Sequence, residues 1–303
     1  MAKVGIVSCD KWKGKIDEDK RLKLALEVLG IKAEIISWEE DKIDDYDLLV
    51  LRSVWGYQNN YEKFKSWLLE LKEKDIQLLN NPNMVLTNIQ KNKQFNILDN
   101  YNIEHINTVF LTSVDLYSVE FSKKLLELAK SNPIVIKPTI SGSGENTFLL
   151  DMNNINSQIP NTIELKEVRE KFEPLIQEND DLEIMIQPYI SEINFGEYSC
   201  IFIDGQLTHT MLRFPNVFHA KQRPYLIEKV PKSVLDLAYK VENIPEFQSY
   251  LYMRVDMVVV DNIPKIMEVE LAEPDLLTKY IENKNVQNEV TKILSKSINR
   301  RVK

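Results

Sequence analysis

The chain has 303 residues, a length that suggests two domains or one subdivided unit at roughly 150 residues per domain. Hydrophobic residues make up 44% of the sequence and charged residues 28%, as in globular proteins, which argues against a disordered or low-complexity chain. With 46 acidic and 38 basic residues the net charge is −8, so we expect no nucleic-acid partner for the surface as a whole.

Targeting signals are absent from the sequence. The N-terminal segment lacks the apolar stretch of a signal peptide, and no run of 18 apolar residues occurs, so we expect no membrane partner. The two cysteines, Cys9 and Cys200, lie far apart and cannot build a four-cysteine zinc site. A reduced, cytoplasmic location is the simplest expectation.

The first hundred residues alternate between strand and helix patterns. Short apolar runs predict strands over Val4–Ser8, Ala33–Ile36 and Asp47–Leu51. Apolar residues at helical spacing predict a helix over Leu22–Leu29 and another around Phe64–Leu71. Because strands that alternate with helices form parallel sheets, this part reads as an α/β domain. No Gly-x-Gly-x-x-Gly follows the first strand, so a dinucleotide site is not indicated.

From about residue 110 the pattern changes to strands joined by short turns. The turns at Asp204-Gly205 and Asp261–Pro264 predict antiparallel hairpins. A helix is expected over Phe121–Lys130. The predicted strands are Ile134–Lys137, Ile184–Gln187, Tyr198–Ile203, Leu207–Leu212, Val255–Val260 and Lys265–Val269. The predicted fold is an α/β N-terminal domain with a parallel sheet, followed by α+β domains with antiparallel sheets.

The segment centred on Asn262 concentrates charge on one face of a predicted hairpin. If the turn lies there, residues whose numbers sum to about 524 lie opposite each other, so Asp256 faces Glu268 and Arg254 faces Glu270. Clustered carboxylates need a counter-charge, and such oxygen ligands favour Mg²⁺ over zinc. A solvated edge with ordinary ion pairs remains the alternative.

A second feature is a lysine at a strand end before a flexible loop, Lys137 and then Ser141-Gly-Ser-Gly144. Backbone N–H groups of such a loop can point at phosphate oxygens while the lysine supplies positive charge. It is not a Walker A loop, because there the lysine follows the glycines. A plain surface turn is the alternative.

In this order, these features resemble the ATP-grasp superfamily of carboxylate ligases over essentially the whole chain. Arg254-x-Asp256 followed by Glu268-x-Glu270 looks like the superfamily's metal motif, with Glu270 in place of the usual asparagine. Among its branches the chain looks most similar to the cycloserine-synthetase-like one, which includes O-ureido-serine cyclo-ligase. The segments that carry this likeness are Leu51–Tyr57, Gln187–Tyr189, Gly196–Ser199, Thr208–Arg213 and Glu268–Pro274. That branch typically has Trp-Asp-Tyr where this chain has Trp55-Gly-Tyr57.

The resemblance implies three parts and two cofactors. Residues 1–108 would form a substrate domain, residues 109–188 a small lid, and residues 189–303 a metal-binding part. The cofactors would be ATP and two Mg²⁺ ions. The second ATP lysine would be Lys91, with Lys93 as the alternative. The residues implied to contact the nucleotide are Lys91, Lys137, Ser141, Gly142, Ser143, Gly144, Gln187, Tyr189, Ile190 and Glu197.

The resemblance also implies roles for the charged hairpin. Asp256, Glu268 and Glu270 would hold the Mg²⁺ ions, and Arg254 would stabilise the transferring phosphoryl group. Three further sets of residues are candidates by position. Arg213 would line the phosphate cleft, Arg52 and Ser53 would face the substrate crevice at the end of a strand, and the loop around Lys221 and Arg223 would cover the site or remain solvated.

The implied reaction activates a small-molecule carboxylate as an acyl phosphate and joins it to an amine, with release of ADP and phosphate. The two substrates stay unnamed, and one molecule could carry both groups; a homodimer also stays open. An ATP-grasp small-molecule kinase is the alternative, since it would use the same metal ligands. A non-catalytic nucleotide sensor is disfavoured, because Arg254, Asp256 and Glu268 are all present.

Overall fold

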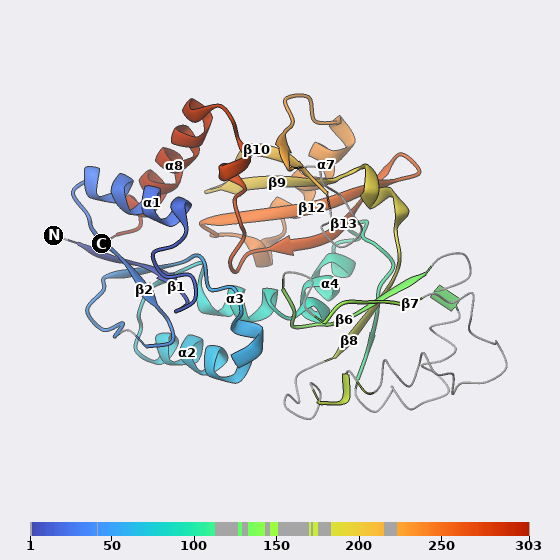
Figure 1. The fold of residues 1–303 in the computed structure, drawn as a ribbon, viewed down its shortest axis with the longest axis horizontal. Coiled ribbons are helices and arrows are strands. Elements are labelled where there is room, and N and C mark those ends of the chain that lie inside the picture. The colour runs from blue at the N-terminus through green and yellow to red at the C-terminus, as the bar shows by residue number, and fades with distance from the viewer. Residues whose placement is uncertain are drawn as a thin grey trace.

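A computed structural model describes residues 2–40, 42–112, 127–128, 133–142, 146–150, 170, 172–174, 183–214 and 223–302, and Figure 1 shows its fold. The helix predicted over Phe121–Lys130 lies outside the described residues except for positions 127–128. Among the described residues, no helix is both long and apolar enough to cross a membrane.

The N-terminal sheet is parallel, as predicted. Its strands are β1 (Lys3–Ser8), β2 (Lys32–Ser37), β3 (Leu48–Leu51) and β4 (Leu78–Leu79), in the order β2-β1-β3-β4. Helices α1 (Asp17–Val28) and α2 (Tyr61–Glu73) pack on its two faces. Because side chains alternate along a strand, Val4 and Ile6 pack with α1 whereas Val7 packs with α2.

The central sheet has five strands. They are β9 (Glu197–Ile203), β10 (Gln206–Arg213), β11 (Tyr225–Leu226), β12 (Tyr252–Val260) and β13 (Ile263–Glu270), in the order β11-β10-β9-β12-β13. All neighbours are antiparallel, which confirms the predicted hairpins. Asp204-Gly205 and Asp261-Asn262 have positive φ at both positions, as two-residue hairpin turns require. Helix α7 (Lys232–Glu242) packs on one face of this sheet.

A smaller antiparallel sheet lies at the lower right of Figure 1. Its strands are β5 (Val109–Leu111), β6 (Ile134–Pro138), β7 (Phe148–Leu150) and β8 (Ile184–Pro188), in the order β5-β8-β6-β7. The 3₁₀ helix η4 (Ser191–Phe195) connects β8 to β9. Within the described residues, the other 3₁₀ helices are η1 (Tyr57–Asn60), η6 (Pro245–Phe247) and η7 (Thr278–Tyr280).

Two short helices, α3 (Pro82–Asn88) and α4 (Lys91–Asn100), attach to the outer edge of β13. An edge strand has unpaired backbone groups, and here buried amide side chains pair with them. Asn88 bonds to Val269 O and Leu271 N, and Gln94 bonds to both backbone groups of Val269. The start of α4 is thereby fixed relative to β13.

The C-terminal helix α8 (Lys284–Asn299) returns to the N-terminal part and lies beside α1, with both chain ends on the same side of the molecule (Figure 1). One apolar cluster therefore contains Val4 of β1, Ile201 of β9, Tyr252 of β12 and Ile298 of α8. The three sheets fall within residues 1–108, 109–188 and 189–303, but the first and third of these ranges share this core. The proposed domain boundaries thus remain an interpretation.

Candidate active site

The hairpin of β12 and β13 brings its charged residues together in the predicted register. Asp256 pairs with Glu268 and Arg254 pairs with Glu270. Next to the turn the paired numbers sum to 523, because Val260 pairs with Ile263 and Met257 with Ile266. A β-bulge next to Asp256 leaves Met267 without a paired residue on β12. Beyond it Asp256 pairs with Glu268, and the paired numbers sum to 524. Without this extra residue Met267, and not Glu268, would face Asp256.

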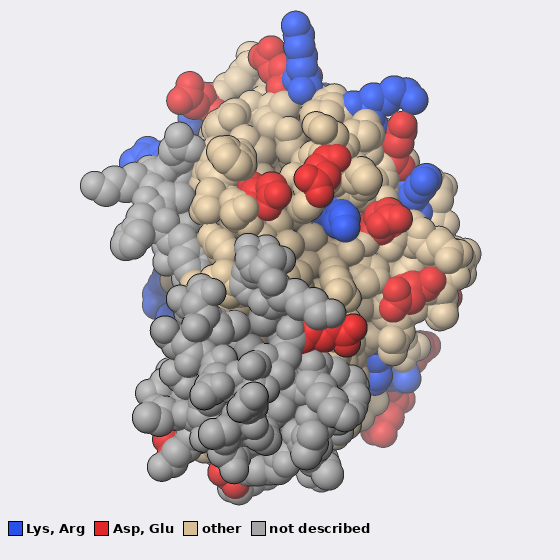
Figure 2. Space-filling view, turned by 90° about the vertical axis from the view of Figure 1, so that its right-hand side faces the viewer, with Lys and Arg blue, Asp and Glu red and all other residues tan. Residues whose placement is uncertain are grey.

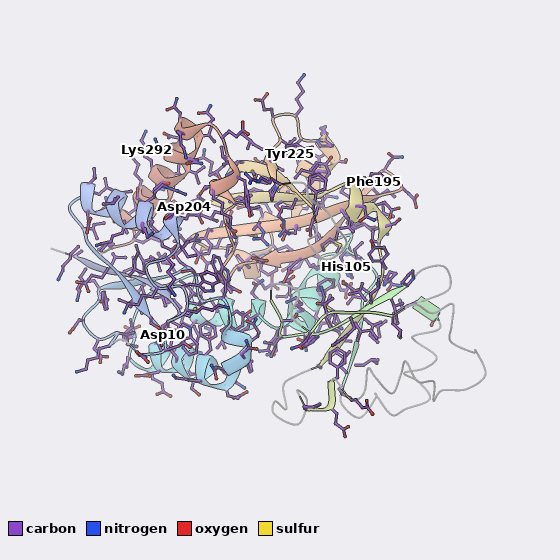
Figure 3. All side chains as sticks on the ribbon, in the orientation of Figure 1. Asp10, His105, Phe195, Asp204, Tyr225 and Lys292 are labelled. Carbon is purple, nitrogen blue, oxygen red and sulfur yellow. The ribbon has the colours of Figure 1, made fainter. Side chains whose placement is uncertain are left out.

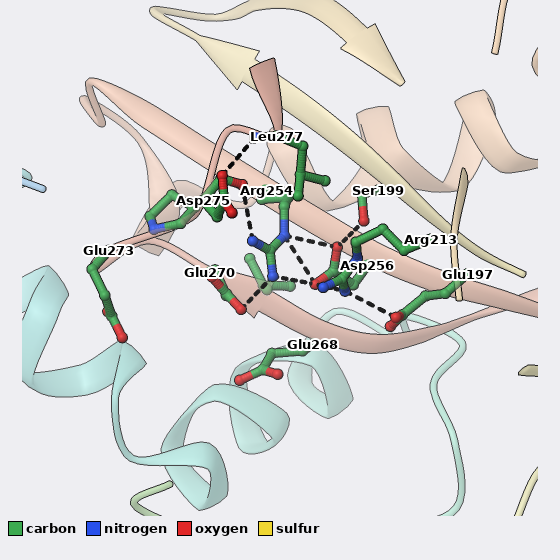
Figure 4. Close-up of polar contacts among 12 residues, drawn as sticks. Glu197, Ser199, Arg213, Arg254, Asp256, Glu268, Glu270, Glu273, Asp275 and Leu277 are labelled. Atoms are coloured by element: carbon green, nitrogen blue, oxygen red, sulfur yellow. Dashed lines mark hydrogen bonds and ion pairs between the residues drawn. The ribbon is translucent and has the colours of Figure 1, made fainter. Parts of the chain in front are cut away.

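Two arginines hold the carboxylate of Asp256, as Figure 4 shows. Arg254 donates to it from Nη2 at 2.8 Å, and Arg213 donates from Nη2 at 2.7 Å. Ser199 on β9 donates a further hydrogen bond at 2.6 Å. Burial opposes the ionised form, but both arginines outweigh it, so the pKa of Asp256 is lowered. Asp256 is thus a buried anion in a cationic setting.

Two other carboxylates of this site, Glu270 and Glu197, are harder to ionise than a free glutamate. Burial raises the pKa of Glu270 to about 8 and the nearby Glu268 and Asp256 add to this, although Arg254 donates to it at 2.5 Å and opposes the shift. Burial raises the pKa of Glu197 to about 7 against the effect of Arg213, which it contacts at 2.9 Å. The arginines therefore do not neutralise the whole group.

The structure brings Lys91, and not the exposed Lys93, to this carboxylate group. Its ammonium group lies 3.1 Å from Oε1 of Glu268 and donates to the backbone oxygen of Ser141 at 2.7 Å. Burial and the charge of Lys91 lower the pKa of Lys137 on β6, while the negative charge of Glu268 opposes this. Glu268 is thus paired with Lys91 and interacts electrostatically with Lys137 from a second segment.

Part of this group lines a cavity of about 390 Å³, hereafter the reaction cavity, whereas Asp256, Lys137 and Glu197 are not among its lining residues. Of the predicted site residues, Lys91, Ser141, Gly142, Arg213, Arg254, Glu268 and Glu270 line it. Its remaining wall comes from Trp12, Trp55, Gly56, Tyr57, Gln58, Asn88, Ile89, Ala272, Glu273, Asp275 and Lys279. Ser143, Gly144 and Lys221 lie outside the described residues, and Arg223 is described but is not among the lining residues.

The expected metal ligands do not form a ready-made site. Within the part of the chain that the structure describes, no three His, Cys, Asp or Glu side chains converge as a metal cluster. Arg254 instead holds Asp256 and Glu270, and Lys91 holds Glu268. The donor set nevertheless fits Mg²⁺, because Asp256, Glu268 and Glu270 supply carboxylate oxygens from facing strands, and a further cation would favour the ionised form of Glu270, whose pKa is raised.

The residues expected around the adenine lie where β8 passes toward β9. Gln187 is buried and donates to Thr108, and the backbone N–H of Tyr189 donates to Pro133 at 2.7 Å. Ile190 precedes η4. None of these three lines the reaction cavity. Their contact with a nucleotide stays a prediction.

Arg52 and Ser53 do not lie where direct substrate contact requires. Both are buried; Arg52 pairs with Glu18 at 2.7 Å, and Ser53 donates to Asp19 at 2.5 Å. Neither lines the reaction cavity. Both residues lie at the end of β3 as expected, but their side chains bind the carboxylates of α1. This pairing cannot be read from the sequence, because the two segments are far apart along the chain. We therefore replace the expected substrate contact by a role in packing α1 against β3.

Sequence reasoning assigned no role to several residues around the site. Glu273 lies within the quoted Glu268–Pro274 motif and Asp275 follows it directly, and their acidic character was the available signal. Ser199 could have been found from the pairing of β9 with β12, which places it opposite Asp256. Trp12 had no signal, because only the fold brings it to Trp55, with ring centroids 6.0 Å apart.

Charge on the surface is mixed. On the described part of the face in Figure 2, acidic and basic side chains are interspersed. Figure 3 shows one exposed pairing, in which Asp204 at the tip of the β9–β10 hairpin lies by α8. Asp204 there forms ion pairs with Arg300 and Arg301.

Both the sequence and the fold resemble those of known proteins. Residues 4–80 match the family described as D-cycloserine synthetase DcsG, N-terminal domain. No curated protein sequence matches the chain. The solved structure of D-cycloserine synthetase DcsG has a TM-score of 0.82 and 17% identity, and the match covers 100% of both chains.

Other ligases share this arrangement. D-alanine–D-alanine ligase from Bacillus anthracis, complexed with ATP, has a TM-score of 0.67 and 18% identity over 99% of this chain and 98% of that one. ATP-grasp ligase PsnB, complexed with minimal precursor, Mg and ADP, has a TM-score of 0.63 and 12% identity over 97% and 96%. The chain therefore has the fold of the ATP-grasp ligases from end to end, and its residues 4–80 match the N-terminal domain of D-cycloserine synthetase.

Proposed function

We propose that the protein is an ATP- and Mg²⁺-dependent ligase that activates a small-molecule carboxylate as an acyl phosphate and joins it to an amine, releasing ADP and phosphate. The observation that carries this proposal is the reaction cavity, in which Lys91, Arg213 and Arg254 surround the carboxylates of β12 and β13. The ligases with this fold support it.

The cavity suits phosphoryl transfer. This reaction needs charge neutralisation and alignment more than a covalent catalyst. Arg254 on β12 and Arg213 on β10 line the cavity and both donate to Asp256, and Lys91 approaches from α4. Bound Mg²⁺, held by Asp256, Glu268 and Glu270, would supply the charge that neutralises the phosphate oxygens. Lys137, Ser141 and Gly142 would hold the nucleotide, with Glu197 near its ribose.

The chemistry of a carboxylate explains why the phosphate is needed. A carboxylate is a poor electrophile, because its negative charge repels nucleophiles and it has no good leaving group. Attack of the carboxylate oxygen on the γ-phosphorus releases ADP and gives an acyl phosphate. The amine nitrogen then forms a bond to the acyl carbon, and phosphate leaves with its electron pair. Arg254 would stabilise the negative charge on the tetrahedral intermediate.

The test is a screen of amino acids and small dicarboxylates for stimulated release of ADP and phosphate, with mass spectrometry of the products. We expect an amide product with one ADP released per bond formed. A phosphorylated hydroxyl product would instead identify a kinase. Full activity in Glu268→Gln would contradict the assignment of the metal ligands.

A further inference from the structure

The wall of the reaction cavity includes a stretch of chain that belongs to no helix or strand. Residues 271–276, hereafter the connecting segment, run from the end of β13 toward η7, and Ala272, Glu273 and Asp275 line the cavity. Four of the six residues are buried. Buried backbone oxygens outside a helix or sheet need other hydrogen-bond donors, so the connecting segment depends on side chains from elsewhere in the chain.

Each of the six backbone oxygens of the connecting segment accepts a hydrogen bond from a different side chain. From residue 271 to residue 276, the donors in turn are Asn80 (2.6 Å), Tyr252 (3.3 Å), Trp55 (3.1 Å), Arg52 (3.4 Å), Arg254 (3.0 Å) and His209 (2.8 Å). For His209 the contact requires the proton on Nε2, which leaves Nδ1 to accept from Thr208 at 2.9 Å. Arg52, Trp55 and Asn80 belong to the N-terminal part, which therefore helps to fix a cavity wall that the C-terminal part supplies.

Among these donors, Arg52 holds the connecting segment at two points. Its Nη1 donates to the backbone oxygen of Pro274, its Nη2 donates to Glu18 at 2.7 Å, and its guanidinium lies 5.1 Å from the ring centre of Tyr252. Glu18 in turn accepts a hydrogen bond from the hydroxyl of Thr278, just beyond the segment. Arg52 thus fixes the segment directly at Pro274 and through Glu18 at Thr278.

The connecting segment supplies one contact of Arg254. The Nε and Nη2 atoms of Arg254 donate to Asp256 and Glu270 of the same hairpin, whereas its Nη1 donates to the backbone oxygen of Asp275 (Figure 4). Because Asp275 is the only one of these acceptors outside the hairpin, a shift of the segment would reorient the guanidinium while its ion pairs persist. Misplacement of a catalytic group by about 1 Å can lower a rate about 10²-fold.

We propose that Arg52 is a positioning residue for the ligase reaction: through the connecting segment it holds the backbone oxygen of Asp275 against Arg254 and so orients that guanidinium in the cavity. Arg52 does not itself line the cavity, so it acts on the reaction only through Arg254. This role rests on the proposed function, because Arg254 is the group that stabilises the transferring phosphoryl there. It adds to the packing of α1 against β3, which the ion pair of Arg52 with Glu18 also serves.

The first test measures steady-state ADP release of the full chain with the acid and amine that the screen identifies. Arg52→Lys keeps the positive charge but loses the planar set of donors that joins Glu18 to Pro274. We expect kcat to fall about tenfold or more while the KM for ATP stays within about twofold, since no residue predicted to contact the nucleotide donates to the segment. Tyr252→Phe removes only the hydroxyl that donates to Ala272 and should lower kcat about threefold, so the test holds even where Arg52→Lys does not fold.

The chain offers a matched control for each variant. Arg301 also joins a carboxylate, that of Asp204, to a backbone oxygen, that of Tyr250, and Arg301→Lys makes the same replacement away from the cavity. Tyr250→Phe removes a buried hydroxyl that donates to Glu242 at 2.9 Å. Both controls should keep kcat within about twofold of the wild type, even if they lower its stability. An unchanged kcat in Arg52→Lys and Tyr252→Phe, an equal loss in the controls, or a KM for ATP that rises as kcat falls would overturn the proposal.

The second test needs no turnover, because Trp55 reports on the connecting segment through its hydrogen bond to the backbone oxygen of Glu273. Hydrogen exchange of its indole N–H, followed by NMR and assigned with Trp55→Phe, should be about fivefold faster in Arg52→Lys and unchanged in Arg301→Lys. Unchanged exchange in Arg52→Lys would show that Arg52 does not fix the segment, and would overturn the proposal. Failure of the ligase proposal would appear separately, as a lack of ADP release by the wild type with every substrate of the screen.

Discussion

Asp256 and Glu268 face each other across β12 and β13 but differ in how strongly the fold depends on them. Asp256 is 1% exposed and holds two arginines and Ser199, whereas Glu268 is partly exposed and pairs with Lys91. Removal of one partner from a buried ion pair typically costs about 3–5 kcal/mol, because the remaining charge is left uncompensated. We therefore expect Asp256→Asn to lose both activity and several kcal/mol of stability.

Glu268→Gln should lose activity while its stability changes by less than about 1 kcal/mol, as for a partly exposed pair. Urea unfolding of both variants, measured beside ADP release, checks this difference. Equal stability losses in the two variants would contradict the distinct structural roles of the two carboxylates.

His209 makes the stability of the protein depend on pH. It is buried on β10, its Nε2 contacts Leu276 O at 2.8 Å, and burial lowers its pKa from 6.5 to about 4. Between pH 4 and pH 6.5 the unfolded chain therefore binds more protons at His209 than the folded chain does. The contribution of His209 to the free energy of unfolding is complete above pH 6.5 and is lost as the pH falls toward 4. Two and a half pKa units predict a loss of about 2 kcal/mol between pH 7.5 and pH 5.

The measurement compares urea unfolding of the wild type and of His209→Gln at both pH values. Glutamine can still donate to Leu276 but does not titrate in this range. The pH-dependent loss should therefore be smaller in the variant by about 2 kcal/mol. The same loss in both proteins would assign the pH dependence to other groups.

Some site residues could be identified from the sequence because their geometry is local. The pairing of Asp256 with Glu268 follows from strand alternation and a turn only a few residues away. The surroundings of Glu273 and Arg52 could not be predicted in this way, since they depend on residues far away along the chain. The position of Arg52 at a strand end suggested a substrate contact, but Arg52 forms an ion pair with Glu18, which only the packing of α1 on β3 shows.

At the scale of elements, strands with strong apolar runs were predicted to within one to three residues, whereas α3, α4 and α8 were not identified. These helices are rich in polar residues, and α4 includes buried Lys91 and Gln94 whose partners lie on other segments. Helix α1 begins at Asp17, five residues before the predicted start, because its acidic first turn carries no apolar signal.

Asn88 tests whether the amide contacts along β13 position the site. Its side chain satisfies Val269 O and Leu271 N, and each of these buried groups would cost about 1–3 kcal/mol if left unpaired. We expect Asn88→Leu to destabilise the fold by several kcal/mol. Because Lys91 begins α4 three residues after Asn88, the variant should also raise the KM for ATP. Denaturant unfolding and steady-state kinetics check both effects.

The exposed Asn288→Leu in α8 is a suitable control, since it makes the same replacement outside this edge. It should alter neither the stability by more than about 0.5 kcal/mol nor the KM for ATP. A destabilised Asn88→Leu with an unchanged KM would show that the amide contacts hold the fold but do not position Lys91.

At the scale of the whole molecule, the first and last segments share one core. Val4, Leu26 and Ile298 belong to the same apolar cluster, although α8 follows β1 by some 280 residues. The small sheet has a separate cluster that contains Ile136. This arrangement predicts that the N-terminal sheet and the central sheet unfold together, while the small sheet is more independent.

The tryptophans allow this to be measured, because all four lie within the first 67 residues and report on the N-terminal part alone. Ile298→Ala removes a fully buried side chain from α8, which should cost about 2–5 kcal/mol. Since the core is shared, tryptophan fluorescence and far-UV circular dichroism should shift to the same lower urea midpoint. Ile136→Ala, equally buried in the small sheet, should move the fluorescence midpoint much less. If Ile298→Ala left the fluorescence midpoint unchanged, the N-terminal sheet would be stable without α8, and the proposed boundary at residue 108 would mark a separately folding domain.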